Sequence, residues 1–382
     1  MRVVISAGGT GGHIYPALAI INKIKEKEPD SEFLYIGTHN RMEKDIIPKK
    51  GIPYKEIEIY GFNKKALSNF KLLKCIIKSY KECKKTIKSF NPDVVIGVGG
   101  YVTAPVILAA AKLKYKTFIH EQNSVPGKTN RFLSKYATKI GISFEDTKKY
   151  FDENKTIFTG NPCNESALSS PKMDLKEVGL TKDFVYIVMG SLGSDKMSNM
   201  LIDMLDKFDK KDYEVVLVTG TNYFDKVKNL KFPKNVKVLP YVDNQTRLMK
   251  QAKLVVSRCG ATTLGEIATL TLPSIIIPSP YVADNHQYKN GLVLEEKKAA
   301  IMIEEKDLTS DNLYEQIDKL MHDDNVLNQM KENLKGLTLA NGATNIYNVL
   351  ASMIGEKNDW KYKKYEYWFS IWKHRFKEIY NL

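Results

Sequence analysis

The sequence predicts an α/β protein in which two Rossmann-like domains face a cleft and a helical tail follows them. Short apolar runs rich in β-branched residues alternate with longer amphipathic segments, which is typical of parallel strands joined by helices. This pattern occurs twice. The two occurrences are separated by a stretch that resembles a linker, formed by Gly160-Asn161-Pro162 and polar residues up to Lys182. A chain of 382 residues is long enough for two such domains.

The expected strands are short and apolar. In the first half they cover residues 3–6, 33–36, 93–98 and 117–120, and in the second half 184–189, 215–218, 236–239, 254–256 and 274–278. Helices are expected from residue 16 onward, over 41–50 and 64–90, and over 104–111. The 64–90 helix carries nine lysines and one acidic residue, Glu82, so it is strongly basic.

A glycine-rich loop separates the first strand from the first helix. Four glycines lie between positions 8 and 12, and His13 follows them directly. Backbone N–H groups and the helix dipole make such a loop an anion site, unless it is only a tight turn. Neither the dinucleotide pattern nor the P-loop pattern fits, because Ile14 occupies the third glycine position and no Gly-Lys-Ser/Thr follows. A helix N-terminus disfavours the imidazolium, so His13 is the candidate general base; alternatively it only hydrogen-bonds a substrate phosphate.

The composition restricts the partners and the compartment. The net charge of +14 favours nucleic acid, an anionic membrane surface or polyphosphate substrates. We expect no nucleic-acid binding, because no such motif occurs and the lysines of 64–88 lie on an amphipathic helix that suits a membrane surface. The four cysteines have no C-x-x-C spacing, which favours a reducing compartment. Neither a membrane span nor a signal peptide is expected.

Two further loops of the second half precede helices. Residues 190–194 form a glycine loop in which Ser191 offers a hydroxyl for a diphosphate. Glu266 lies just beyond the loop at 257–263, where its carboxylate suits two adjacent sugar hydroxyls; the alternative is a solvated helix acid. No D-x-D pair occurs, so we expect no metal and no cofactor, with backbone N–H groups stabilising the leaving group instead.

Four motifs in this order resemble the MurG family of glycosyltransferases over roughly residues 1–350. They are the loop at 8–17, Gly97-Val98-Gly99-Gly100-Tyr101 with His120-Glu121-Gln122-Asn123, Gly260-Ala261-x-Thr263-x-x-Glu266, and Asp284-x-x-Gln287-Tyr288-x-Asn290. The resemblance implies a GT-B fold. It also implies an inverting transfer of N-acetylglucosamine from UDP-GlcNAc to the C4 hydroxyl of the muramyl sugar of lipid I, which makes lipid II for peptidoglycan.

The resemblance also implies an organisation and a site. We expect an acceptor and membrane-binding domain at 1–163, a UDP-sugar domain at 164–341, and a helix with an aromatic basic tail at 342–382. We expect a peripheral protein on the cytoplasmic face of the membrane, with cell-wall synthesis proteins as further partners. His13 is expected to be catalytic, and the substrate-binding residues are expected to be Thr10, Gly11, Gly12, His13, Asn123, Ser191, Val242, Thr262, Thr263, Glu266 and Gln287.

The chain departs from the family pattern on the donor side. The Gly-Gly-Ser-Gln-Gly loop of the family is Met-Gly-Ser-Leu-Gly at 189–193, and its Gln-Gln pair is His286-Gln287. The family's Gly-Asn-Pro-x-Arg ends in Asn164, so a cation that would face the diphosphate is missing, and Arg258 or Lys196 are candidates to replace it. Two alternatives remain open: a lipid glycosyltransferase that uses diacylglycerol, and a UDP-GlcNAc 2-epimerase.

Other polar and aromatic residues have weaker assignments. His39, His120 and His322 lack metal-ligand spacing and are expected to be surface or structural residues, and Asn123 either lies near the donor sugar or caps a loop. The segment 355–382 holds all three tryptophans and an aromatic face at helical spacing. That face fits a membrane interface, a helix packed on the first domain, or a partner-binding helix.

Overall fold

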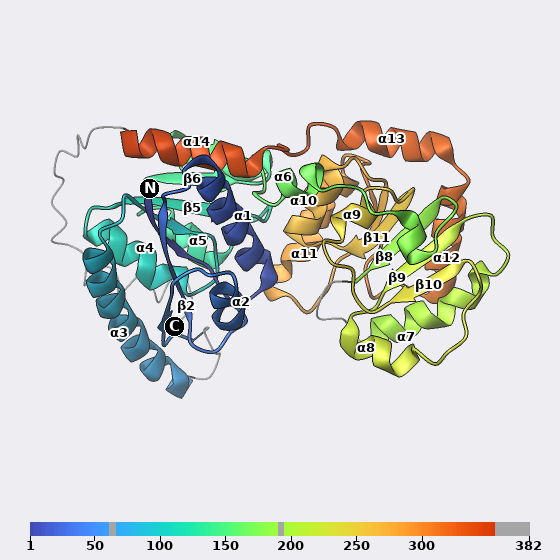
Figure 1. Cartoon of the computed structure of the whole chain (residues 1–382), viewed down its shortest axis with the longest axis horizontal. Coiled ribbons are helices and arrows are strands. Elements are labelled where there is room, and N and C mark those ends of the chain that lie inside the picture. Colours follow the sequence, from blue (N-terminus) through green and yellow to red (C-terminus); the bar gives the residue numbers. More distant parts are fainter. Residues whose placement is uncertain (61–65, 190–194, 356–382) are drawn as a thin grey trace.

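The computed structural model describes residues 1–60, 66–189 and 195–355, and shows two α/β lobes side by side (Figure 1). The first lobe is built on a seven-stranded sheet in the order β3-β2-β1-β4-β5-β6-β7, in which all paired strands are parallel. The strands are β1 (Arg2–Ser6), β2 (Glu32–Thr38), β3 (Tyr54–Ile57), β4 (Val94–Gly97), β5 (Lys116–Glu121), β6 (Lys139–Ile142) and β7 (Thr156–Phe158).

The order of this sheet reverses between β1 and β4, which lie next to each other. Ligands of doubly wound sheets bind at such a switch point, beyond the carboxyl ends of the strands. The helices of the lobe cover both faces of the sheet and bury two apolar clusters. They are α1 (Gly11–Lys27), α2 (Glu43–Lys49), α3 (Ala66–Phe90), α4 (Thr103–Lys112) and α5 (Lys128–Leu133), with 3₁₀ turns η1 (Glu145–Tyr150) and η2 (Glu153–Lys155).

The second lobe repeats this plan on a six-stranded parallel sheet in the order β10-β9-β8-β11-β12-β13. Its strands are β8 (Phe184–Val188), β9 (Glu214–Val218), β10 (Val236–Leu239), β11 (Leu254–Arg258), β12 (Ser274–Ile277) and β13 (Ile301–Met302). Its helices are α6 (Asn164–Ser169), α7 (Asp195–Met204), α8 (Thr221–Val227), α9 (Thr246–Met249), α10 (Ala261–Thr269), α11 (His286–Glu295), α12 (Ser310–Met321) and α13 (Asp324–Leu334), with 3₁₀ turns η3 (Leu175–Val178), η4 (Leu205–Phe208) and η5 (Ala283–Asn285).

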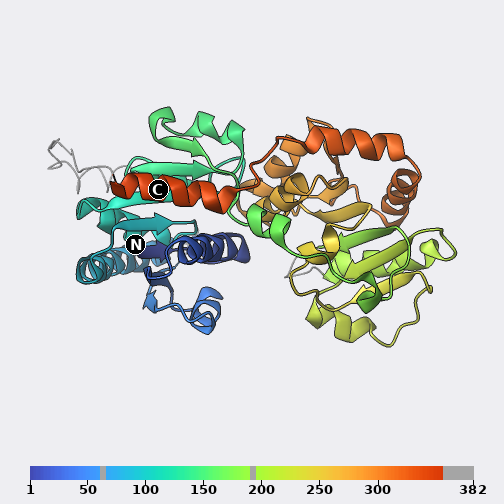
Figure 2. The same ribbon diagram turned by 45° about the horizontal axis from the view of Figure 1, so that its top comes forward.

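The last described helix, α14 (Gly342–Gly355), leaves the second lobe and lies along the first, beside α1 (Figure 2). Its Ile346, Leu350 and Met353 are buried in the core of the first lobe. The chain therefore crosses between the lobes twice.

The stretch at 160–182, which the sequence presents as a polar linker, contains α6 and η3 and is partly buried. Asn164 is fully buried at the start of α6. Its Nδ2 donates to Oγ1 of Thr338 at 3.0 Å and to the carbonyl of Leu339 at 3.1 Å. Asn164 thus ties the outgoing crossing of the chain to the returning one.

The predicted α/β class with two Rossmann-like units is confirmed, and each predicted strand is present within one or two residues of its expected ends. The prediction omitted β3, β6, β7 and β13. Along the described residues, no helix has the length and apolarity required to cross a membrane. The predicted aromatic tail at 356–382 lies outside the described part of the chain.

Candidate active site

Two glycine loops meet at the switch point of the first sheet, one after β1 and the other after β4. The N–H of Gly8 donates to the carbonyl of Gly99 at 3.3 Å. Gly100 has a φ of +86°, and a Cβ atom there would lie 2.4 Å from the carbonyl oxygen of Gly8. Only glycine permits this backbone conformation together with so close an approach.

His13 lies in the first turn of α1, against both loops. A Cβ atom on Gly99, whose φ is +112°, would lie 2.4 Å from Cδ2 of His13, so the second loop makes room for the imidazole ring. Nδ1 of His13 lies 3.1 Å from the carbonyl oxygen of Gly8. A carbonyl can only accept, so Nδ1 carries the proton and Nε2 of the neutral ring keeps a lone pair. That is the tautomer that a general base at Nε2 requires.

The surroundings of His13 favour its neutral form. Burial lowers its pKa, the carbonyl of Gly8 acts in the opposite direction, the charge of His286 lowers it further, and Glu43 raises it. His286 is the first residue of α11, so a side chain of the second lobe influences the histidine of the first. A histidine with a lowered pKa is ready to accept a proton at neutral pH.

Glu266 lies on α10, in the second lobe, and is only 9% exposed. Burial raises its pKa to about 7, against a hydrogen bond from Gln245. Its Oε2 has no hydrogen-bond partner among the described residues, and the same holds for Oγ1 of Thr262 in the first turn of the helix. A buried carboxylate oxygen without a protein donor is costly, so a water molecule or a ligand that donates to it would be stabilising. The solvated helix acid considered from the sequence is therefore wrong.

The remaining predicted donor-side residues have different surroundings. Val242 is part of the core of the second lobe, and Thr263 is half-buried in the first turn of α10. Gln287 uses Oε1 to accept from the N–H of Ser279 at 2.8 Å, which fixes the loop after β12. Ser191 lies outside the described residues, as does the side chain of Lys196.

Of the two candidates for the missing cation, Arg258 and Lys196, only Arg258 has a described side chain. Arg258 is buried with Glu305, with Nη2 2.7 Å from Oε2 and side-chain exposures of 11% and 7%. Its charge is therefore engaged by Glu305 within the second lobe. Asn164 is turned toward Thr338 and Leu339, as described above.

Asn123 lies at the contact between the two lobes. Its Oδ1 accepts from Nδ2 of Asn290, on α11, at 3.1 Å. Oδ1 of Asn290 in turn accepts from N–H and Oγ–H of Ser124 at 2.9 and 3.1 Å. Asn290 is fully buried, and its Nδ2 also donates to the carbonyl of Cys259 at 3.3 Å. These asparagines thus join the lobes, and Asn290 of the fourth motif stabilises the contact between them.

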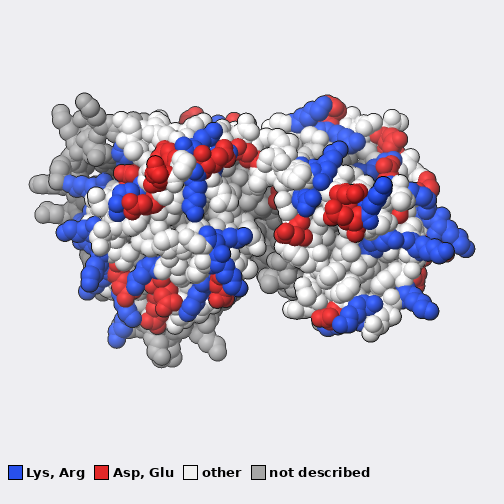
Figure 3. Space-filling view, viewed as in Figure 1, with Lys and Arg blue, Asp and Glu red and all other residues white. Residues whose placement is uncertain are grey.

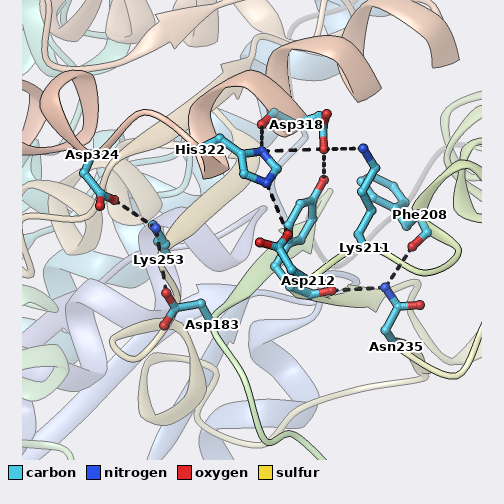
Figure 4. A network of polar contacts seen from close by, with 10 residues as sticks. Asp183, Phe208, Lys211, Asp212, Asn235, Lys253, Asp318, His322 and Asp324 are labelled. Carbon is cyan, nitrogen blue, oxygen red and sulfur yellow. Dashed lines mark hydrogen bonds and ion pairs between the residues drawn. The ribbon is translucent and has the colours of Figure 1, made fainter.

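Three other histidines were expected to be surface or structural residues. His120 is fully buried beside Thr159 and Gly160, and burial lowers its pKa to about 4. His39 is half-buried and packs edge-on against Tyr60. His322 is half-exposed between Asp318 and Asp212 in a polar network of the second lobe (Figure 4). In the described part of the chain, no cluster of three or more His, Cys, Asp or Glu side chains could hold a metal ion.

Comparison with known families identifies this arrangement. Residues 3–142 match the model of the glycosyltransferase family 28 N-terminal domain, and residues 184–346 match that of the C-terminal domain. The chain belongs to glycosyltransferase family 28. The resemblance drawn from the four motifs is thereby confirmed, and both glycine loops lie in the N-terminal domain of this family.

Among curated relatives of this family, the UDP-N-acetylglucosamine–N-acetylmuramyl-(pentapeptide) pyrophosphoryl-undecaprenol N-acetylglucosamine transferase 1 of Bacillus cereus is 44% identical over 362 residues, which cover 93% of this chain and 100% of the relative. The corresponding transferase of Bacillus licheniformis is also 44% identical and covers 92% of this chain and 99% of its own length.

Two solved structures have a similar fold. MurG of Acinetobacter baumannii has a TM-score of 0.75 at 26% identity, covering 92% of this chain and 99% of its own. The UDP-GlcNAc 2-epimerase of Methanocaldococcus jannaschii has a TM-score of 0.62 at 16% identity, covering 92% and 100%. The fold is therefore shared with epimerases, and it does not by itself separate the two activities.

Sequence reasoning missed Glu43 and Ser124, and it did not foresee the contacts of Asn290. Glu43 contacts the first glycine loop from 34 residues away, because β2 lies beside β1 and α2 follows β2. An acidic residue at the start of a predicted helix gives no such signal. Asn290 was noticed within a motif, but its contact with Ser124 spans 166 residues and depends on how the lobes meet.

Proposed function

We propose that this chain transfers N-acetylglucosamine from UDP-GlcNAc to the C4 hydroxyl of the muramyl sugar of lipid I, which forms lipid II. The observation that carries the proposal is the identity of 44% across the full length of transferases named for this reaction. Two features support it: a neutral histidine in the first lobe, and in the second lobe a buried carboxylate with one oxygen that has no partner among the described residues.

The proposed reaction assigns a role to each of these groups. The acceptor oxygen forms its bond to the anomeric carbon while the bond from that carbon to UDP breaks, and UDP leaves with the electron pair. The acceptor proton moves to Nε2 of His13, since Nδ1 already donates to Gly8. A single displacement of this kind inverts the anomeric carbon.

On the donor side, Glu266 accepts hydrogen bonds from the ribose hydroxyls through the oxygen that has no protein partner. Thr262 and Thr263 lie in the first turn of α10, where N–H groups point outward and suit a diphosphate. We assign Ser191 to the same diphosphate, and Thr10, Gly11 and Gly12 to the acceptor side. Asn123 contributes to donor binding indirectly, because its hydrogen bond with Asn290 holds the two lobes together. Gln287 contributes indirectly as well, because it fixes the loop after β12.

We further propose that the first domain, residues 1–163, binds the acceptor at an anionic membrane surface on the cytoplasmic face, and that residues 164–341 bind UDP-GlcNAc. Over its described side chains, α3 exposes the lysines at 74, 78, 81, 84, 85 and 88 while burying Cys83 and Ile87. On the face of the molecule in Figure 3, basic residues are spread over both lobes among acidic ones. The tail at 356–382 and cell-wall synthesis proteins are further candidates for anchoring.

The decisive experiment is a transfer assay with labelled UDP-GlcNAc. We expect label in the product only when a lipid I analogue is present. Isomerisation of UDP-GlcNAc without any acceptor would instead indicate the epimerase, and transfer to diacylglycerol would indicate the other lipid glycosyltransferase.

Membrane binding is tested by sedimentation with anionic vesicles at low and high salt, which compares the full chain with a chain lacking 356–382. Equal binding by both chains would show that the tail does not anchor the protein.

A further inference from the structure

Glu43, the first residue of α2, is a fully buried carboxylate that the reaction described above does not use. Its Oε1 accepts from the N–H of Thr38 at 3.1 Å and from the Oγ–H of the same residue at 2.6 Å. Its Oε2 accepts from the N–H of Gly9 at 3.2 Å. All three contacts bring donors to the carboxylate, which is the arrangement that suits its ionised form.

The contact with Gly9 links Glu43 to His13 through one peptide group. The N–H of Gly9 and the carbonyl of Gly8 belong to the same planar peptide bond, and its two polar groups point in opposite directions. Glu43 holds the N–H side, and Nδ1 of His13 lies 3.1 Å from the oxygen on the other side. Carboxylate, peptide and imidazole thus form a continuous hydrogen-bonded chain.

This chain has a chemical consequence. A carboxylate that accepts from an amide N–H polarises the amide and makes its carbonyl a stronger acceptor. The stronger carbonyl favours the tautomer with the proton on Nδ1. When Nε2 takes a proton, the positive charge that develops on the ring is attracted by the carboxylate, and the pKa of His13 already responds to Glu43 in this direction.

We propose that Glu43 is the positioning residue of His13, acting through the Gly8–Gly9 peptide to fix the tautomer of the imidazole and to stabilise its protonated form during transfer. The proton of the acceptor moves to Nε2, the proton on Nδ1 stays there, and Glu43 takes up no proton in this step. The inference rests on the proposed role of His13 as the base.

A purely structural role for Glu43 is the competing explanation, and the fold allows the two to be separated. The loop has other supports, because the hydroxyl of Tyr35 donates to the carbonyl of Ala7 at 2.9 Å and that of Tyr54 to the carbonyl of Thr38 at 2.6 Å. Removing the charge of Glu43 while keeping its size therefore leaves much of the support in place. A purely structural role requires the size and the hydrogen bonds of Glu43, whereas the proposed role also requires its negative charge.

The first test uses the native protein and needs no substrate. Nitrogen-15 NMR of the histidine side chains, with His13→Ala to assign the signal, reports the tautomer and the pKa of His13. We expect the proton on Nδ1 in the neutral form. A neutral ring with its proton on Nε2 would overturn the proposal, whichever sugar the enzyme transfers.

The second test compares Glu43→Gln with Asp45→Asn, a control that removes a charge from an exposed position on the same helix. In Glu43→Gln we expect the pKa of His13 to fall and kcat to drop roughly tenfold, with the KM for UDP-GlcNAc unchanged. The acid limb of the pH profile of kcat/KM should move to lower pH. Asp45→Asn should leave all four quantities unchanged.

The outcomes separate this proposal from the proposed function. A folded Glu43→Gln protein with an unchanged His13 pKa and acid limb would show that Glu43 is only structural. If Glu43→Gln does not fold, Glu43→Asp is measured instead, because it withdraws the carboxylate from Gly9 by one methylene, and the same criterion applies. Failure of the native chain to transfer N-acetylglucosamine would contradict the function and leave the NMR result standing.

Discussion

The two halves of the site differ in how their buried polar groups are satisfied. At His13, the imidazole Nδ1 and the carboxylate of Glu43 have partners within the protein, because Glu43 accepts from Gly9 and the carbonyl of Gly8 faces Nδ1. At Glu266, Gln245 donates to the carboxylate, but its Oε2 and the nearby Oγ1 of Thr262 have no partner in the described part of the chain. One half is therefore organised before substrate arrives, and the other is completed by it.

This difference has a physical meaning for catalysis and binding. A base must be held in one tautomer and one orientation, and hydrogen bonds inside the protein achieve this without substrate. A binding pocket gains affinity when the ligand satisfies groups that were buried at a cost. We therefore expect changes near His13 to act on turnover and changes near Glu266 to act on donor affinity.

The largest expected effect is that of His13→Ala. Loss of general base catalysis should lower kcat by about 10²–10⁴-fold, since proton transfer by a positioned side chain contributes that much. Steady-state kinetics with UDP-GlcNAc and a lipid I analogue measure it. Turnover near the native rate would show that His13 is not the base, and it would contradict the assignment of turnover to this half of the site.

Gly99→Ala sharpens the comparison by moving His13 without removing it. The added Cβ would collide with the imidazole ring at a backbone φ of +112°, and a displacement of about 1 Å can cost roughly 10²-fold in kcat. Gly51→Ala is the matched control, because Gly51 also has a positive φ, of +69°, but no neighbour within 4 Å. Equal kcat losses in the two variants would show that the backbone strain, rather than the contact with His13, causes the effect.

Glu266→Gln tests whether the pocket carries an uncompensated carboxylate. Because burial raises its pKa from 4.5 to about 7, the native state binds the proton more tightly than the unfolded state. The free energy of unfolding should then decrease as pH rises from 4.5 to 7, by up to about 3 kcal/mol over the whole window. The free energy of unfolding, measured by urea unfolding at several pH values, should decrease in this way for the native protein but not for Glu266→Gln. The same slope in both proteins would assign it to another group.

The smallest expected effect is at His322, which belongs to neither half of the site. Its contacts with Asp318 and Asp212 raise its pKa above 6.5, so its stabilising contribution is present below that pH and disappears as pH rises through the raised value. The side chain is half-exposed, so the destabilisation by His322→Gln should be larger at pH 5.5 than at pH 8 by less than about 1 kcal/mol. A change in kcat for this variant would mean that the site extends further than we describe.

The sequence predicted the parts of the fold that carry a local signal. Strands such as β1 and β4 are continuous apolar runs, and they were found, as were the glycine loops that follow them. β3, with the sequence Tyr-Lys-Glu-Ile, and β13, with two residues, carry little apolar pattern. They form because the neighbouring strand offers an edge, which sequence alone does not display.

For the site, residues adjacent to a motif were found, and contacts between distant segments were not. His13 and Glu266 stand beside glycine loops, so their residue types and positions suggested roles. Arg258 was considered for a cationic role, but its ion-pair partner Glu305 is 47 residues away in the sequence and could not be foreseen. Glu43 was missed for the same reason.

The most direct test of the difference between the two halves is the dissociation constant for UDP-GlcNAc in His13→Ala and Glu266→Ala, measured by titration calorimetry. Loss of a charged hydrogen bond of about 1.5–3 kcal/mol should weaken binding by roughly 10- to 150-fold in Glu266→Ala. His13→Ala should bind within about twofold of the native protein, because its polar contact is internal. Equal weakening in both variants, or none in Glu266→Ala, would contradict the account.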